Sequence, residues 1–153
     1  MRKGIIVAVL LIGAFILWKA LSTTEEERIR RTLMDGKRAI EREDLKGVMK
    51  HVSMFYRDDY GFTYLRVRAL FQRLFEEFDD IQIFVDRMEV KLKDDDNATA
   101  ILLTWATARG KEGKGYIACS GQEPCRVRID LEKGGGSWRV TRVQGVRPGE
   151  VFE

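Results

Sequence analysis

The sequence predicts an α+β fold in which N-terminal helices pack on a curved, mostly antiparallel sheet. Residues 24–78 repeat apolar side chains at helical spacing, whereas residues 80–143 alternate apolar and polar side chains as strands do. A hydrophobic segment precedes both regions and is expected to be helical. We therefore divide the 153 residues into a hydrophobic membrane anchor or signal peptide, 1–22, and one domain, 23–153, which is long enough to bury a core.

The first segment is apolar on every side. Gly4 to Trp18 carries no charge and follows Arg2 and Lys3. Residues 4–21 would form a helix of about 27 Å at ~1.5 Å per residue, just enough to span a bilayer. The segment predicts contact with a membrane through residues 4–21 and places the domain on the extracytoplasmic side, periplasmic or extracellular.

Whether this segment is retained or removed stays open. Trp18 and Lys19 are typical of a helix end at a membrane surface, which favours a retained anchor. Ala20 and Ser22 occupy the small-residue positions of a signal-peptidase site, which favours secretion after cleavage near Ser22.

Three helices are expected next. Thr24 begins a capping box, and apolar residues continue at helical spacing to residue 42. Asp44 can cap a short second helix. After the loop 53–61, Thr63 precedes a third helix. The apolar stripe of this helix consists of Val67, Leu70, Phe71, Leu74, Phe75 and Phe78.

The strands show two further features. The alternation in residues 80–94 changes parity at Asp86-Arg87, which predicts a bulge or a bend. Residues 98–109 are apolar on both faces, as in a strand covered on both sides. Shorter alternating segments surround residues 116–119, 126–131 and 138–143, and an antiparallel meander is expected.

Two cysteines, Cys119 and Cys125, flank a turn sequence. In an oxidising compartment they predict a disulfide that closes a small loop. Two cysteines and one distant histidine do not make a tetrahedral metal set, so no metal or other cofactor is expected.

The charge balance argues against nucleic acid as a partner. Arg2, Lys3 and Lys19 belong to the hydrophobic segment, and removing them from the 27 basic residues leaves 24 against 24 acids. A formally neutral domain without a Lys/Arg stripe is a poor phosphate-backbone binder.

The order of elements resembles the nuclear transport factor 2-like superfamily, which includes SnoaL-like and cystatin-like cones. The resemblance covers about residues 24–146 and is carried by Glu43-Asp44-Leu45, by residues 56–61 (YRDDYG) and by Ser137-Trp138-Arg139-Val140. It implies a helix-backed cone with an apolar pocket. Members include isomerases, dehydratases and hydrolases as well as binding and assembly domains, so the fold does not decide the function.

Candidate site residues cluster around the loop before the third helix. If the chain is an enzyme, the candidates are His51, Asp58, Asp59 and Tyr60, as a base or as partners of an oxyanion. The alternative is that the aspartates order the loop and the tyrosines pack. Residues that could line a ligand pocket form a second set: Tyr56, Tyr60, Phe71, Phe75 and Trp105. Plain core packing is the alternative for these aromatics.

No convergent catalytic set is visible, so we expect a membrane-anchored binding or assembly module without catalysis. Its partners would be an envelope protein complex or a small apolar ligand. The alternative is a cofactor-free isomerase, dehydratase or hydrolase acting on a small apolar molecule.

Self-association is also expected. One apolar face of residues 98–108 needs cover, and Ala98, Ala100 and Ala106 would allow a second sheet to approach in a homodimer. The alternative is that residues 146–152 cover this face within one chain.

Overall fold

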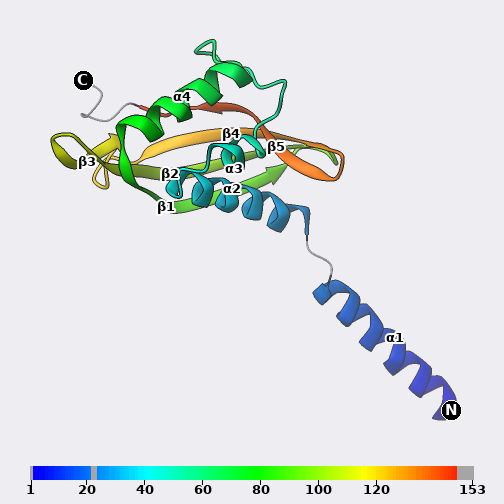
Figure 1. The fold of residues 1–153 in the computed structure, drawn as a ribbon. Coiled ribbons are helices and arrows are strands. Elements are labelled where there is room, and N and C mark those ends of the chain that lie inside the picture. The colour runs from blue at the N-terminus through cyan, green and yellow to red at the C-terminus, as the bar shows by residue number, and fades with distance from the viewer. Residues whose placement is uncertain (1, 22–23, 148–153) are drawn as a thin grey trace.

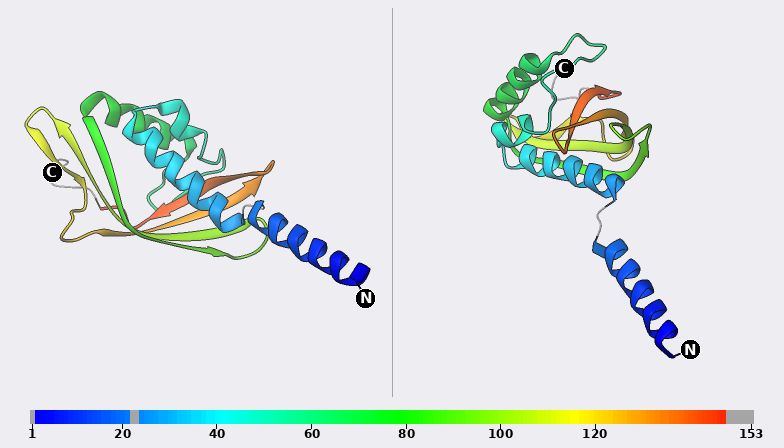
Figure 2. Two further views of the ribbon diagram at one scale, coloured as in Figure 1. Left: turned by 90° about the horizontal axis from the view of Figure 1, so that it is seen from below. Right: turned by 90° about the vertical axis from the view of Figure 1, so that its right-hand side faces the viewer.

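The computed structural model describes residues 2–21 and 24–147, although not the side chains of residues 20 and 21. It contains the elements α1 (Arg2–Leu21), α2 (Glu25–Glu41), α3 (Leu45–Met49), α4 (Tyr64–Glu77), β1 (Asp79–Leu92), β2 (Asn97–Gly110), β3 (Gly113–Ala118), β4 (Cys125–Gly134) and β5 (Ser137–Gln144). Helices α2, α3 and α4 lie on one side of a curved antiparallel sheet, which confirms the predicted α+β fold (Figures 1 and 2).

Helix α1 projects away from the domain (Figure 1). Every side chain described in it, from Arg2 to Lys19, is exposed. In the part of the chain that the structure describes, no helix is both long enough and apolar enough to cross a membrane. The predicted cleavage position, Ser22, lies outside the described residues.

The predicted caps of the next two helices are confirmed. The Thr24 hydroxyl accepts a hydrogen bond from the Glu27 backbone N–H at 3.2 Å, and Asp44 accepts one from the Gly47 N–H at 3.0 Å. Each cap satisfies a backbone donor that lacks a partner within the first turn of a helix. Ile29, on the buried face of α2, packs against the sheet.

Helix α4 packs through most of its predicted stripe. Val67 is buried, and Phe71 and Phe75 pack against the same cluster. Leu70 departs from the prediction, since 45% of its surface is exposed. The contact face of α4 is therefore narrower than the apolar stripe in its sequence.

The sheet is not a simple meander. The strand order is β1-β2-β4-β5, and β3 also pairs with β2. The 14 residues of β2 provide one edge long enough for two strands: Ala106 pairs with Ala118 of β3, and Thr104 pairs with Cys125 of β4. Strands β3 and β4 therefore pair with the same edge of β2, one after the other along its length.

The bulge predicted in β1 is confirmed. The register with β2 shifts between Val85 and Arg87, at the position of the parity change. Ile81 and Val85 before the shift, and Met88 and Val90 after it, all pack into the core. One extra residue keeps both halves of the strand facing the helices.

The two faces of β2 differ from the prediction. The alanines face the helices: Ala98 and Ala100 pack with Ile29 of α2, and Ala106 packs in the cluster of Phe78. Ala100 has no exposed surface, so these alanines cannot contact a second sheet. Their small side chains instead let α2 lie close to the strand.

The outer face of β2 carries larger side chains, Ile101, Leu103 and Trp105, all partly buried. Trp105 stacks on Phe84 of β1, with ring centroids 5.3 Å apart. The alternative to a homodimer is that residues 146–152 cover this strand within one chain. Most of those residues lie outside the described part of the structure.

Candidate functional site

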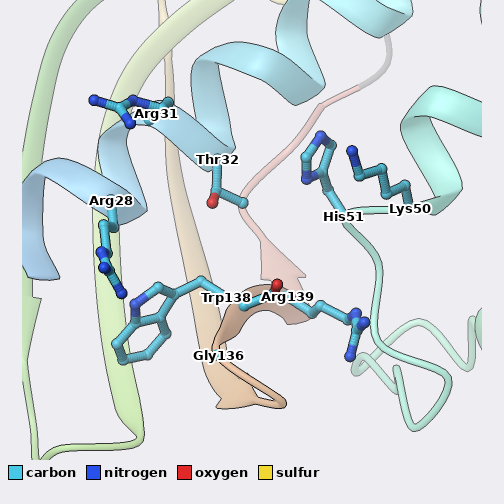
Figure 3. Close-up of a pocket in the computed structure, with 9 residues that line it drawn as sticks. Arg28, Arg31, Thr32, Lys50, His51, Gly136, Trp138 and Arg139 are labelled. Atoms are coloured by element: carbon cyan, nitrogen blue, oxygen red, sulfur yellow. The ribbon is translucent and has the colours of Figure 1, made fainter.

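A surface pocket lies between α2, the residues that follow α3, and the β4–β5 hairpin (Figure 3). Its volume is about 360 Å³. Nine residues line it: Arg28, Arg31, Thr32, Lys50, His51, Gly136, Ser137, Trp138 and Arg139. Four of these residues are arginine or lysine, and the described lining includes no carboxylate.

One tryptophan fixes the wall of this pocket. Trp138 is only 3% exposed, and its indole N–H donates a hydrogen bond to Oε2 of Glu25 at 2.8 Å. Glu25 also forms ion pairs with Lys133 at 3.1 Å and Arg28 at 3.5 Å. The hydrogen bond from Trp138, helped by both cations, lowers the pKa of Glu25. This carboxylate therefore ties the hairpin to the first turn of α2.

The backbone holds His51 in place. Its carbonyl oxygen accepts a hydrogen bond from the Val140 N–H at 2.8 Å, and the Ser53 N–H donates to the Val140 carbonyl at 2.8 Å. The residues after α3 thus pair with the free edge of β5 through a parallel bridge between Val52 and Val140.

The imidazole of His51 is half-buried beside α2. A methyl group at Gly36 would stand 4.0 Å from Cδ2 of His51, so the ring lies near a position of α2 without a side chain. Desolvation lowers the pKa of His51, Lys50 lowers it further, and Asp35 opposes both. The neutral ring, which can donate and accept hydrogen bonds, is favoured at neutral pH.

Three cations at this pocket have no acidic partner in the part of the chain that the structure describes. Within residues 2–21 and 24–147, no carboxylate lies within ion-pair distance of Arg31, Lys50 or Arg139. They come from α2, from the end of α3 and from β5. In Figure 3 Lys50 lies beside His51, Arg139 extends from the hairpin away from Trp138, and the guanidinium of Arg31 points away from Thr32. Their charges are available to an external anion.

A second surface pocket, of about 580 Å³, adjoins the first through Lys50. It lies between α3 and α4 and is lined by six residues: Leu45, Lys46, Met49, Lys50, Tyr64 and Arg68. Its described lining combines three cations with Leu45, Met49 and Tyr64 and includes no carboxylate.

The predicted catalytic candidates do not come together. Asp58 accepts hydrogen bonds from the N–H groups of Tyr60 and Phe62, both at 2.9 Å, and from the Tyr56 hydroxyl at 2.9 Å. Asp58 therefore orders its own loop. His51 lies in the cationic pocket instead.

Asp59 and Tyr60 are also placed away from any shared site. The carboxylate of Asp59 accepts hydrogen bonds from the Arg142 guanidinium at 2.6 Å and from the Gln144 side-chain amide. These two partners lower the pKa of Asp59. This pair attaches the loop to β5. The side chain of Tyr60 is 63% exposed.

The residues predicted to line a ligand pocket do not form one: three pack together in the core, and Tyr60 and Trp105 lie elsewhere. Tyr56 is buried among the side chains under α4, where burial and then Asp58 raise its pKa, and Phe71 and Phe75 pack beside it. Trp105 belongs to the outer face of the sheet. None of the five residues predicted for that pocket lines either surface pocket.

The predicted disulfide is confirmed between Cys119 and Cys125, whose Cα atoms are 5.6 Å apart. It closes the loop that carries the chain from β3 to β4 along β2. Among the described residues, no cluster of histidine, cysteine, aspartate and glutamate could hold a metal ion.

Sequence reasoning missed the cations of the pocket. Arg28 and Arg139 are separated by more than a hundred residues, and no local motif links them to Lys50. Of the lining residues, the sequence identifies His51 as a catalytic candidate, and Ser137, Trp138 and Arg139 only as features of the fold.

The architecture, helices backing a curved five-stranded sheet, is that of a nuclear transport factor 2-like cone. No known family model matches the chain, and no curated protein matches its sequence.

Solved structures share this fold. A candidate aromatic ring hydroxylase of Novosphingobium aromaticivorans superposes with a TM-score of 0.69 at 16% identity, over 84% of this chain and 94% of that one. A candidate scytalone dehydratase of the same organism gives 0.70 at 12% identity, over 81% and 83%. An NTF2-like protein of unknown function from Pseudomonas putida gives 0.62 at 16% identity, over 80% and 85%. The chain has the fold of these proteins.

Proposed function

We propose that the chain is a binding or assembly module without catalysis, carried at a membrane by its N-terminal helix. The observation that carries the proposal is the dispersal of the catalytic candidates. Asp58 is used by its own loop, Asp59 is paired with Arg142, and Tyr60 faces solvent. A general acid or base must lie within hydrogen-bond reach of its substrate and of its partner groups.

The proposed location rests on α1. Its described side chains are apolar for most of its length and exposed, and Arg2 and Lys3 precede the apolar run. Exposed apolar surface of this extent is typical of a segment that contacts a membrane or a partner. We propose attachment through residues 4–21 with the domain on the extracytoplasmic side, or secretion after cleavage near Ser22.

The location has a direct test in cells that express the full chain. Intact mass of the mature protein distinguishes cleavage near Ser22 from retention of residues 1–22. Protease added to intact cells or spheroplasts should digest the domain when it is extracytoplasmic. A chain of full mass in the soluble cytoplasm, with both thiols open to alkylation, would exclude the proposed location.

A specific observation favours one alternative. His51 lines a pocket and has a lowered pKa, as a general base at neutral pH would. The alternative function is a cofactor-free isomerase, dehydratase or hydrolase that acts on a small apolar molecule. The cationic lining does not suit such a substrate, which is why the binding role is preferred.

Turnover assays separate the two functions. The full chain should show no hydrolysis of aryl esters or epoxides, no dehydration of hydroxy ketones and no isomerisation of enones above the rate of a His51→Gln variant. Turnover that is lost in His51→Gln but kept in Tyr60→Phe would replace the binding role with an enzymatic one.

A further inference from the structure

We propose that the pocket between α2, His51 and the β4–β5 hairpin binds a phosphate-bearing anion. This inference rests on the binding role proposed above and names the ligand class of that site. The shared chemistry is a phosphate group, either free in solution or in the headgroup of an anionic phospholipid.

The charges of the lining favour an anion. Arg31, Lys50 and Arg139 lie around one pocket without an acidic partner among the described residues, and Lys46 and Arg68 extend the cationic surface into the adjoining pocket. Like charges gathered in a concave surface repel one another and concentrate anions from solution. Binding of an anion would remove this repulsion.

The origin of the donors in separate elements favours phosphate over a single carboxylate. The cations come from three separate elements, and Thr32 adds a hydroxyl to the lining. One guanidinium can satisfy both oxygens of a carboxylate in a single plane. A phosphate offers several oxygens in different directions, so it suits donors that come from separate elements and must rotate to reach it.

The pocket is anchored firmly enough to be a site. Trp138 is buried and bonded to Glu25, and the backbone of His51 is paired with Val140. The walls are therefore fixed, while the long side chains on the rim can rotate to contact the ligand. Glu25 is engaged by Trp138 and Lys133, so it competes only partly for Arg28.

The first helix of the domain connects this pocket to α1. Arg28 and Arg31 lie in the first two turns of α2, which follows α1 after three residues. If α1 contacts a membrane, the pocket lies close to that surface, where the phosphates of lipid headgroups are concentrated. The experiment must therefore separate lipid phosphate from soluble phosphate.

The single histidine of the chain provides the probe. The Cε1–H resonance of His51 is followed by NMR in the full chain, held in nanodiscs of zwitterionic phosphatidylcholine. One arm adds inorganic pyrophosphate at constant ionic strength, set with chloride. The other arm replaces part of the lipid with phosphatidylglycerol and adds no soluble phosphate.

A saturable shift of the resonance, with a raised pKa of His51, is expected in at least one arm, and the arm in which it occurs identifies the source of the phosphate. In Lys50→Gln and Arg139→Gln the affinity should fall by about fivefold or more, as expected for loss of one charge-assisted contact. Lys111→Gln and Arg73→Gln remove the same charges from exposed positions outside both pockets and should leave the affinity unchanged.

No saturable shift in either arm, or equal losses in the pocket and control variants, would overturn the proposal. Thermal unfolding of all four variants verifies that they remain folded. Turnover in the assays above would remove the non-catalytic role, whereas only the NMR titration decides whether the pocket binds phosphate. The two failures are therefore distinguishable.

Discussion

The pH response of His51 follows from its partly desolvated position. Its pKa in the folded protein is below the usual value of 6.5, so the unfolded chain binds more protons near that pH. The stabilising contribution of the neutral ring is present above pH 6.5 and is lost as the pH falls below it. Desolvation and then Lys50 lower the pKa of His51 and favour the neutral ring, while Asp35 opposes them. Arg31 and Arg139 line the same pocket.

We therefore predict that His51→Gln flattens the decrease in stability between about pH 7 and pH 5. Unfolding of the full chain in neutral detergent, followed by circular dichroism at several pH values, measures this change. An unchanged pH profile in the variant would show that other groups produce the decrease.

A second prediction concerns Ser53, a buried polar residue that is 2% exposed. Its hydroxyl donates to Glu132 at 2.8 Å and accepts from the Phe55 N–H at 3.1 Å. Ser53→Ala removes the hydroxyl from both partners and should lower the free energy of unfolding by about 1–3 kcal/mol. Denaturant unfolding measures the loss, and the exposed Ser137→Ala serves as the control with little effect.

At the scale of elements, the backbone near the end of β5 is restricted. Gly145 has φ +89°, and a methyl group there would collide with the backbone carbonyl oxygen of Arg126. Gly145→Ala should lower stability by more than about 1 kcal/mol, because both the conformation and the space exclude a side chain.

Gly134 provides the matched control for this prediction. Its φ is not in the left-handed region, and no atom lies within 4 Å of an added methyl group. Gly134→Ala should therefore unfold at nearly the wild-type temperature. Equal melting temperatures for the two variants would contradict the assignment of strain to Gly145.

Local patterns predicted the individual elements well. Thr24 and Asp44 cap helices, and the parity change at Asp86-Arg87 marks the bulge, because each depends on neighbouring residues alone. The two faces of residues 98–109 were both apolar, so their pattern could not show which one the helices cover. The position of β3 and β4 on one edge of β2 depends on strand lengths and pairing, which no local pattern records.

The candidate site was less predictable for the same reason. Its cations come from elements far apart in the chain, and a count of charges gave a neutral domain. Neutral net charge conceals local separation of charge: Arg142 is paired with Asp59, whereas Arg139 three residues earlier has no carboxylate within ion-pair distance among the described residues.

At the scale of the whole molecule, self-association remains a prediction, now on the face that carries Leu103 and Trp105. Full-length protein in density-matched detergent should sediment as a dimer, and Leu103→Glu should yield a monomer because it places a charge within the apolar contact. Lys111→Glu, in the turn between β2 and β3, is the control. A monomeric wild-type chain at tens of micromolar would exclude this contact.

The contacts between the two ends of the domain also determine when it can fold. Trp138 bonds to Glu25 across 113 positions of the chain, and β5 provides the edge on which His51 to Ser53 pair. During synthesis α1 and α2 leave the ribosome well before β5 exists, and non-local contacts form only once both partners are present. A targeting machinery could therefore engage the apolar helix while the rest of the chain is still unfolded and able to pass through a narrow translocation channel.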